Sequence, residues 1–247
     1  METNQIEALS RLIGTSNNTV FFGGAGASTE SGIPDFRSEA GLHKARQMYG
    51  HPPEELLSRT FFDREPELFF RYYKENLIAR DAKPNAAHIK LAQLERSGKL
   101  QAIVTQNIDG LHQAAGSQNV LELHGSNWRQ YCMNCKAKYS LDYILAQGGV
   151  PNCEKCGGIV RPDVVLYEEG LDGAVLGAAA QAIADAELLI VGGTSLAVYP
   201  AAGLLRYFSG GSLVLINKSE TLADRNAKLV IRGSIGAVLS AVTNEIR

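Results

Sequence analysis

The chain has 247 residues, of which 45% are hydrophobic and 20% charged, and its formal net charge is −2. This composition is typical of a globular protein with one large domain, or with a domain and a small module. The nearly balanced charge argues against nucleic acid or a membrane surface as the main partner. The N-terminus lacks the basic and apolar regions of a signal peptide, and no apolar run is long enough to cross a membrane, so we expect a cytoplasmic protein.

Apolar residues at helical spacing predict a first helix over residues 4–14, and a short buried strand is expected at 19–22. The strand leads directly into Gly24-Ala25-Gly26. This pattern is typical of a dinucleotide-binding turn, because small residues let the backbone approach a pyrophosphate and a helix N-terminus offers N–H donors. The match to G-x-G-x-x-G is incomplete, since Thr29 replaces the third glycine, so a plain strand–turn remains the alternative for this segment alone.

The loop that follows this turn contains Asp35, Phe36 and Arg37. Taken alone, these three residues would belong to an ordinary surface loop. Placed directly after a phosphate-binding turn, a ring and a guanidinium can cover a reactive ribose and contact phosphate oxygens. Residues 38–80 are rich in aromatic residues interrupted by prolines, and they predict short helices inserted after the first nucleotide-binding unit.

Polar residues follow the next predicted strand, at 100–104, where its carboxyl end delivers Gln106, Asn107 and Asp109. Ligands in open α/β sheets bind at the carboxyl ends of strands, so these side chains are candidate contacts to a ribose and a carboxamide. The alternative role for Asp109 is to cap the following helix.

One histidine has a distinctive position. A short strand predicted at 119–123 ends at His124, and none of the other four histidines lies at the carboxyl end of a predicted strand beside a glycine. Histidine is suited to general base catalysis because its pKa lies near neutrality. A histidine alone is more often structural, so this interpretation depends on the polar residues at the neighbouring strand ends.

The four cysteines form two C-x₂-C pairs, a spacing typical of a zinc ribbon. Each pair lies on a tight turn that directs both sulfurs toward one metal. Four thiolates complete a tetrahedron and leave no open position, which predicts a single structural zinc ion rather than a catalytic one. Two disulfides are the alternative, and a cytosolic chain disfavours them. The predicted ligands are Cys132, Cys135, Cys153 and Cys156.

The remainder of the chain alternates predicted strands and helices. The strand at 188–191 opens into a second small-residue turn, which includes Thr194 and Ser195 and can hold phosphate oxygens. This alternation indicates an α/β fold with a doubly wound parallel sheet. Further strands are expected at 161–167, 212–216 and 229–231, and helices at 172–187 and 235–246.

Taken together, the motifs resemble those of the sirtuin family, which are NAD-dependent protein lysine deacylases, and most of all its compact bacterial members. The resemblance covers essentially the whole chain. It implies a Rossmann-type NAD-binding domain (1–37, 81–126 and 159–247) and a small domain made of a helical insert (38–80) and a zinc-ribbon module (127–158). The matching segments are 24–28, 31–37, 105–109, 124–125, the two cysteine pairs, 161–163, 193–196 and 200–201.

By this resemblance the catalytic residues are His124, as the general base, with Asn107 and Asp109. The implied reaction is lysine deacetylation: the acyl group moves to ADP-ribose, nicotinamide is released and O-acetyl-ADP-ribose is formed. The residues expected to hold NAD are Ala25, Thr29, Phe36, Arg37, Gln106, Ile108, Asp109, His124, Thr194, Ser195, Asn217 and Ile235.

The expected substrates are proteins or peptides that contain acetyl-lysine, bound as an added strand through main-chain hydrogen bonds. Two departures from the family pattern concern this groove. Glu168 stands where glycine is common, which adds a carboxylate. The stretch taken as equivalent to the succinyl-specific Tyr-x-x-Arg, 70–73, has no arginine at the second place of that pair, where Tyr73 stands. We therefore expect an apolar acyl pocket. The expected peptide contacts are Val165, Leu166, Tyr167, Ala197, Val198 and Tyr199.

Two other classes of function fit the same motifs. A protein ADP-ribosyltransferase or an NAD hydrolase would use the same NAD site and differ in whether product formation requires acyl-lysine. An NAD-sensing binding module would not turn NAD over, and it would have no need of Asn107, Asp109 and His124. The chain is expected to be a monomer, with no direct contact to nucleic acid or membrane.

Overall fold

The computed structural model describes residues 3–35 and 38–243, and the strands in this part of the chain form two separate sheets. The larger sheet is parallel throughout, and the smaller sheet is antiparallel. In spatial order the large sheet contains β3 (Val120–Glu122), β2 (Ala102–Thr105), β1 (Thr19–Gly23), β7 (Leu188–Gly192), β8 (Ser212–Asn217) and β9 (Leu229–Arg232), and the small sheet contains β5 (Lys138–Ser140), β4 (Gly125–Cys132) and β6 (Val160–Val164).

Helices connect these strands, and none in the described ranges is both long and apolar enough to cross a membrane. The α-helices are α1 (Thr3–Thr15), α2 (Glu39–Tyr49), α3 (Pro53–Leu56), α4 (Arg59–Arg64), α5 (Pro66–Asn76), α6 (Ala86–Arg96), α7 (Leu111–Ala114), α8 (Leu141–Leu145), α9 (Gly173–Asp185) and α10 (Ile235–Ser240). The 3₁₀ helices are η1 (Ala25–Ala27), η2 (Thr29–Ser31), η3 (Ala201–Tyr207) and η4 (Leu222–Asn226).

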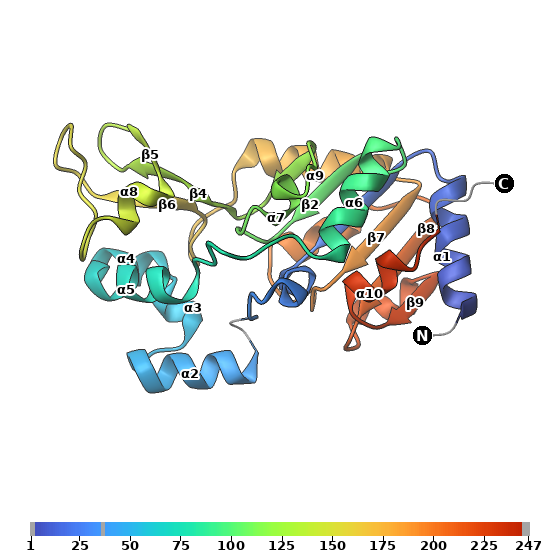
Figure 1. The fold of residues 1–247 in the computed structure, drawn as a ribbon, viewed down its shortest axis with the longest axis horizontal. Helices are drawn as coiled ribbons and strands as arrows, with labels where there is room; N and C mark the ends of the chain where they lie inside the picture. The colour runs from blue at the N-terminus through green and yellow to red at the C-terminus, as the bar shows by residue number, and fades with distance from the viewer. Residues whose placement is uncertain (1–2, 36–37, 244–247) are drawn as a thin grey trace.

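The large sheet is the middle of three layers. Successive side chains of a strand point to opposite faces, so Phe21 of β1 points to one side, and Val20 and Phe22 to the other. Phe21 packs with buried residues of α1, α6 and α10, whereas Val20 and Phe22 pack with α9 and η3. Parallel sheets need this cover on both faces, and Figure 1 shows the helices on either side of the strands. The predicted α/β, doubly wound fold is confirmed.

A second hydrophobic core joins the helical insert to the small sheet. Phe69 of α5 makes edge-to-face contacts with Phe62 and Phe70, and this aromatic group packs against Cys132 and Val160. Figure 1 shows the small sheet and helices α2–α5 together at the end of the molecule opposite α1, and these elements are called the small lobe below. Because β6 pairs with β4, the small sheet extends beyond residue 158, and the predicted domain boundaries remain predictions.

The segment after β1 differs from the expected start of a helix. It forms two short 3₁₀ turns, η1 and η2, and a left-handed Gly32 ends the second. The segment after Pro200 is also 3₁₀, in η3. The closing helix α10 ends at Ser240, and residues 244–246 of the helix predicted at 235–246 lie outside the described residues.

Two buried histidines pack against each other between α6 and α7. The ring centroids of His88 and His112 are 4.7 Å apart, and among the described residues neither ring nitrogen of His112 has a hydrogen-bond partner. Burial, together with the positive charge that His88 would carry, lowers the pKa of His112 to about 3. Burial also lowers the pKa of His88. Both rings are therefore neutral packing elements, in keeping with the structural role expected of an isolated histidine.

Replacing His112 with phenylalanine should make the protein less sensitive to acid. In the unfolded chain a histidine has a pKa of about 6.5, so below that pH the unfolded state binds a proton that folded His112 excludes. Stability is therefore lost as pH falls from about 6.5 toward the folded pKa, and His112 accounts for about 2 kcal/mol of the loss between about pH 7.5 and about pH 5. Urea unfolding of wild type and His112→Phe at both pH values measures the difference.

The exposed His43 on α2 provides the control. His43→Phe should keep the wild-type change of unfolding free energy with pH. The zinc ligands are common to all three proteins, so their titration cancels in the comparison. An equal acid-induced loss in wild type and His112→Phe would contradict the assignment of His112.

Candidate active site and metal centre

The two small-residue turns meet at the carboxyl ends of β1 and β7. Gly24 N–H donates to the carbonyl of Gly192 at 3.3 Å, and Gly26 N–H donates to the carbonyl of Gly193 at 2.8 Å. A Cβ on Gly26 would lie 2.6 Å from Gly193 Cα, closer than carbon atoms approach without contact strain. Glycine at position 26 is therefore required by the contact between the two turns, a reason that the motif alone did not provide.

A polar cluster lies beside this contact. Asn107 Nδ2 donates to the carbonyl of Gly24 at 3.1 Å and to Ser28 Oγ at 3.0 Å. Ser28 Oγ donates to Asp109 Oδ2 at 2.7 Å, while Asp109 Oδ1 accepts from Leu111 N–H at 2.9 Å. Gly110 is the N-cap of α7, and Asp109, one residue before it, bonds the first N–H of the helix through one oxygen and the cluster through the other. Ser28 was not among the predicted site residues, although it ends the glycine-rich turn.

His124 lies next to the cluster, just beyond β3. Its Nδ1 is 2.9 Å from the backbone carbonyl of Gln106. A carbonyl can only accept, so in the neutral ring Nδ1 carries the hydrogen and Nε2 is the acceptor. The Gln106 backbone is fixed in turn, because its N–H donates to the carbonyl of Gly23 at 3.0 Å and its side chain donates to Thr194 Oγ1 at 3.1 Å.

A cavity of about 220 Å³ brings most of these residues together. The cavity lies between the residues that follow β2 and β3 of the large sheet and the residues of the helical insert and of the segment after β6. Of the predicted site residues, the structure places the following on its wall: Ala25, Gln106, Asn107, Ile108, Asp109, His124, Val165, Leu166, Tyr167, Val198 and Tyr199.

Other predicted site residues lie elsewhere. Thr194 and Asn217 are buried and bond to each other, with Thr194 N–H donating to Asn217 Oδ1 at 3.1 Å and Asn217 Nδ2 to the Thr194 carbonyl at 3.0 Å. Ile235 is buried in the core beneath Gly193. These three support the second turn from behind. Thr29, Ser195 and Ala197 do not line the cavity, and Phe36 and Arg37 lie outside the described residues.

The wall formed by the small lobe contains polar residues that the sequence did not single out. Tyr73 hydroxyl donates to Asn127 Oδ1 at 2.9 Å, and Asn127 Nδ2 donates to the carbonyl of Leu77 at 2.7 Å. Tyr73 and Asn76, one helical turn apart on α5, both line the cavity, whereas residues 70–72 do not. The part of α5 that lines the cavity is therefore at Tyr73 and Asn76, and residues 70–72 of the expected stretch face elsewhere. None of the described lining residues is lysine or arginine.

An ion pair fixes the loop that borders this wall. Arg161 is buried, and its Nη1 and Nη2 lie 2.6 and 3.0 Å from the two carboxylate oxygens of Glu169. Burial raises the pKa of Glu169, but hydrogen bonds from Arg161 and from Leu166 N–H outweigh it, so this pKa lies below the ordinary value. The carboxylate is ionised at neutral pH, and the bidentate geometry sets the path of residues 165–169.

Both main-chain polar groups of Tyr167 make hydrogen bonds within the protein. Its N–H donates to the carbonyl of Leu57 at 3.0 Å, and its carbonyl accepts from Arg59 N–H at 3.0 Å. These two bonds form a parallel bridge between this segment and the helical insert. A peptide that adds here as a strand must therefore bond to main-chain groups outside Tyr167, and the predicted peptide contacts remain predictions.

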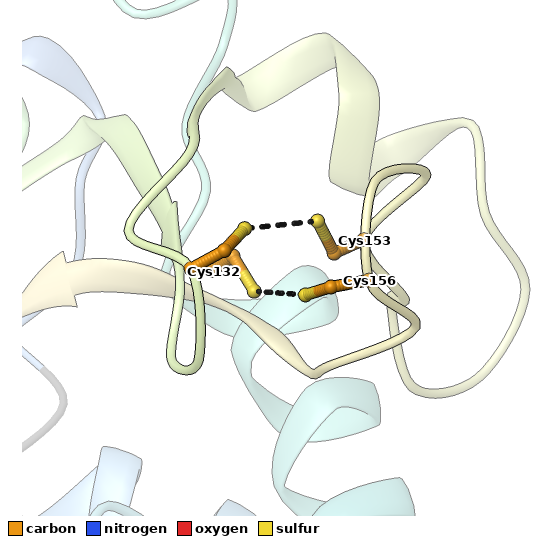
Figure 2. A group of neighbouring side chains, drawn as sticks. Cys132, Cys153 and Cys156 are labelled. Carbon is orange, nitrogen blue, oxygen red and sulfur yellow. Dashed lines mark hydrogen bonds between the residues drawn. The ribbon is translucent and has the colours of Figure 1, made fainter.

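The four cysteines converge at one point of the small lobe. Their sulfur atoms all lie within 4.8 Å of one another, with Cys132 and Cys156 3.5 Å apart, and Cys135 and Cys153 3.6 Å apart. Figure 2 shows the labelled sulfur atoms pointing inward. A tetrahedron with Zn–S bonds of about 2.3 Å has sulfurs about 3.8 Å apart, so these residues fit one structural zinc ion.

Residues 24–200 match the model of the Sir2 family. The chain belongs to the Sir2 family. Curated relatives named NAD-dependent protein deacetylase include proteins of Clostridium acetobutylicum, 58% identical, and Clostridium perfringens, 60% identical. Each alignment spans 240 residues and covers 97% of this chain and 98% of the relative.

Solved structures of Sir2 proteins share the fold. A Sir2 protein in complex with a deacetylated p53 peptide and 3′-O-acetyl-ADP-ribose has a TM-score of 0.88 and 40% identity, over 96% of this chain and 97% of that chain. A Sir2 complex with a p53 peptide and NAD⁺ has a TM-score of 0.85 and 39% identity, over 97% and 96%. The resemblance to sirtuins is thus confirmed at the level of the family.

Replacing Cys156 with serine should release the metal and loosen the small lobe. The ion cross-links two distant turns, and Cys132 and Cys153 belong to the same core as the aromatic residues of α4 and α5. Elemental mass spectrometry should find one zinc ion per wild-type chain and less than one in Cys156→Ser. The variant should also have a lower melting temperature. Asn134→Ala, an exposed change between two ligands, should keep the zinc. A zinc-free wild type with unchanged melting temperature would contradict the structural role.

Gly26→Ala should destabilise the Sir2 fold by about 1–3 kcal/mol, because the added carbon collides with the second turn. Gly177→Ala is the matched control, since a Cβ there meets nothing within 4 Å and the residue lies inside α9. That control should gain about 0.5–1 kcal/mol from the lower entropy of its unfolded state. Chemical unfolding measures both changes. An equal effect of the two substitutions would mean that the turns can move apart at little cost.

Proposed function

We propose that this Sir2-family chain is an NAD-dependent protein deacetylase that transfers the acetyl group of lysine to ADP-ribose, with release of nicotinamide and O-acetyl-ADP-ribose. The observation that carries the proposal is a single cavity that combines His124 with the Ser28–Asn107–Asp109 cluster and with the groove segments around Tyr167 and Val198. The names of the relatives and the contents of the Sir2 complexes point to the same reaction.

His124 is proposed as the general base. The carbonyl of Gln106 holds the hydrogen of the neutral ring on Nδ1, which makes Nε2 the atom that takes a proton from a ribose hydroxyl. The same carbonyl stabilises the ring once it is charged, because Nδ1–H can continue to donate to it. Gln106 is held by β1 and by Thr194, so the imidazole is oriented before any ligand binds.

The donors and acceptors of the cluster fit NAD. Asn107 and Asp109 place an amide and a carboxylate on the cavity wall, where ribose hydroxyls and a carboxamide can bond. When bound, NAD supplies the ribose that accepts the acyl group and the nicotinamide that leaves. Thr194, Asn217 and Ile235 would support the turn. The other members of the proposed NAD set are Ala25, Gln106, Ile108, Asp109 and His124 on the cavity wall, and Thr29, Phe36, Arg37 and Ser195.

The wall opposite the polar cluster is proposed to hold the acyl-lysine. Leu57, Leu77 and Val164 contribute apolar side chains to this wall, and the hydroxyl of Tyr73 already donates to Asn127. Since no described lining residue carries a positive side chain, an acyl group with its own carboxylate would be left without a counter-charge. Acetyl and other uncharged chains therefore suit this pocket better than succinyl or malonyl.

His124→Ala should abolish deacetylation while leaving NAD binding largely intact. Loss of a general base lowers turnover by about 10²–10⁴-fold. The measurement is mass spectrometry of an acetyl-lysine peptide incubated with and without NAD, following loss of acetyl and appearance of O-acetyl-ADP-ribose. NAD binding can be followed separately by the fluorescence of Trp128, the one tryptophan of the chain, whose Nε1 donates to the carbonyl of Asp109 at 2.7 Å.

His43→Ala, an exposed histidine in α2, is the control and should retain wild-type turnover. A succinyl peptide run alongside should react more slowly than the acetyl peptide. Nicotinamide release without any peptide, or ADP-ribose attached to protein, would instead identify an NAD hydrolase or an ADP-ribosyltransferase. Full activity of His124→Ala would remove this residue from the catalytic step.

A further inference from the structure

The residue that follows the groove segment 165–167 has an unusual backbone conformation. Glu168 has a φ of 75°, in the left-handed region that residues with a side chain rarely adopt. Glycine would adopt it without strain. The chain nevertheless has a glutamate here, at the edge of the cavity that also contains His124.

Hydrogen bonds hold the Glu168 carboxylate in one place. Its Oε2 accepts from Thr60 N–H at 2.8 Å and from Thr60 Oγ1 at 2.7 Å. These bonds hold the pKa of the carboxyl below its usual range, so Glu168 is charged at neutral pH. A flexible surface glutamate would be free to move its charge away from a bound peptide, and this one is not.

The charged residues around Glu168 form ion pairs with one another, and none of these pairs includes the Glu168 carboxylate. Arg161 pairs with Glu169 at 2.6 Å, and Arg59 is shared between Asp63 at 2.8 Å and Glu169 at 3.3 Å. No cation in the described part of the chain lies within ion-pair distance of Glu168. With neither lysine nor arginine among them, the described residues that line the cavity have a net negative charge around Glu168.

Acetyl-lysine itself is uncharged, so a negative groove can attract a substrate only through the residues that flank the modified lysine. We infer that Glu168 makes the protein select acetylated peptides that carry arginine or lysine close to the acetyl-lysine, an inference that rests on the proposed deacetylase function. A cation beside the carboxylate gains Coulomb attraction, whereas an acidic neighbour is repelled, and both effects decrease with salt. Glu168 is thus a specificity-determining residue.

The test uses acetyl-lysine peptides that are identical except for arginine, glutamine or glutamate at the positions next to the acetyl-lysine. We expect wild type to prefer the arginine peptide over the glutamate peptide by about ten-fold in kcat/KM at low salt, mainly through KM. In Glu168→Gln the ratio should fall close to one, because the amide oxygen can still accept from Thr60 but the charge is gone. Raising the salt concentration should reduce the wild-type ratio.

Glu7→Gln, which removes an exposed charge from α1 at the other end of the molecule, should keep the wild-type ratio (Figure 1). Fluorescence anisotropy with dye-labelled peptides gives the same comparison without turnover. Charge-selective binding with no deacetylation would overturn the proposed function but support the groove inference. Deacetylation with a ratio near one in wild type, or a ratio unchanged in Glu168→Gln, would overturn the inference and leave the function standing, and absence of both binding and turnover would overturn both.

Discussion

Direct contact between two backbones determines the geometry of the whole site. Gly26 lies on Gly193 with no space for a side-chain carbon, and paired hydrogen bonds lock the two turns together. Gln106 reaches both turns, through the carbonyl of Gly23 and the hydroxyl of Thr194, and its own carbonyl orients His124. The proposed base is therefore positioned through a chain of short contacts that begins at a pair of glycines.

The other side of the cavity depends on a different set of forces. An apolar core shared by α4, α5 and the cysteine turns supports Tyr73, and the buried Arg161–Glu169 pair fixes the loop after β6. Arg161 also lies over the rings of Phe62 and Tyr131, so one guanidinium joins the aromatic core to the groove. The cluster around Asn107 and His124 thus belongs to the strand ends of the large sheet, whereas Leu57, Tyr73 and Leu77 reach the same cavity from the helical insert.

Local patterns in the sequence predicted much of this arrangement. The buried strands, the cysteine pairs and the polar residues after β2 are all encoded within short windows, and the structure places Asn107, Asp109 and His124 on one cavity. Other features depend on contacts between distant segments. The 3₁₀ turns after β1 contact Gly193, which lies in the second half of the chain. The hydrogen bond between Tyr73 and Asn127 joins α5 to β4. An aromatic residue such as Tyr73 could not be separated from its core neighbours by pattern alone.

The shared core of the small lobe also constrains how the chain is made. The aromatic residues of α4 and α5 leave the ribosome well before Cys153 and Val160, which complete their cover. Until that point Phe62, Phe69 and Phe70 can pack only against apolar residues of the helical insert, and the contacts from the cysteine turns require closure of a long loop. The large sheet has the same property, since β1 pairs with β7. Neither unit can be completed from the first half of the protein alone, so part of the aromatic core lacks its native cover until the second cysteine pair has been synthesised.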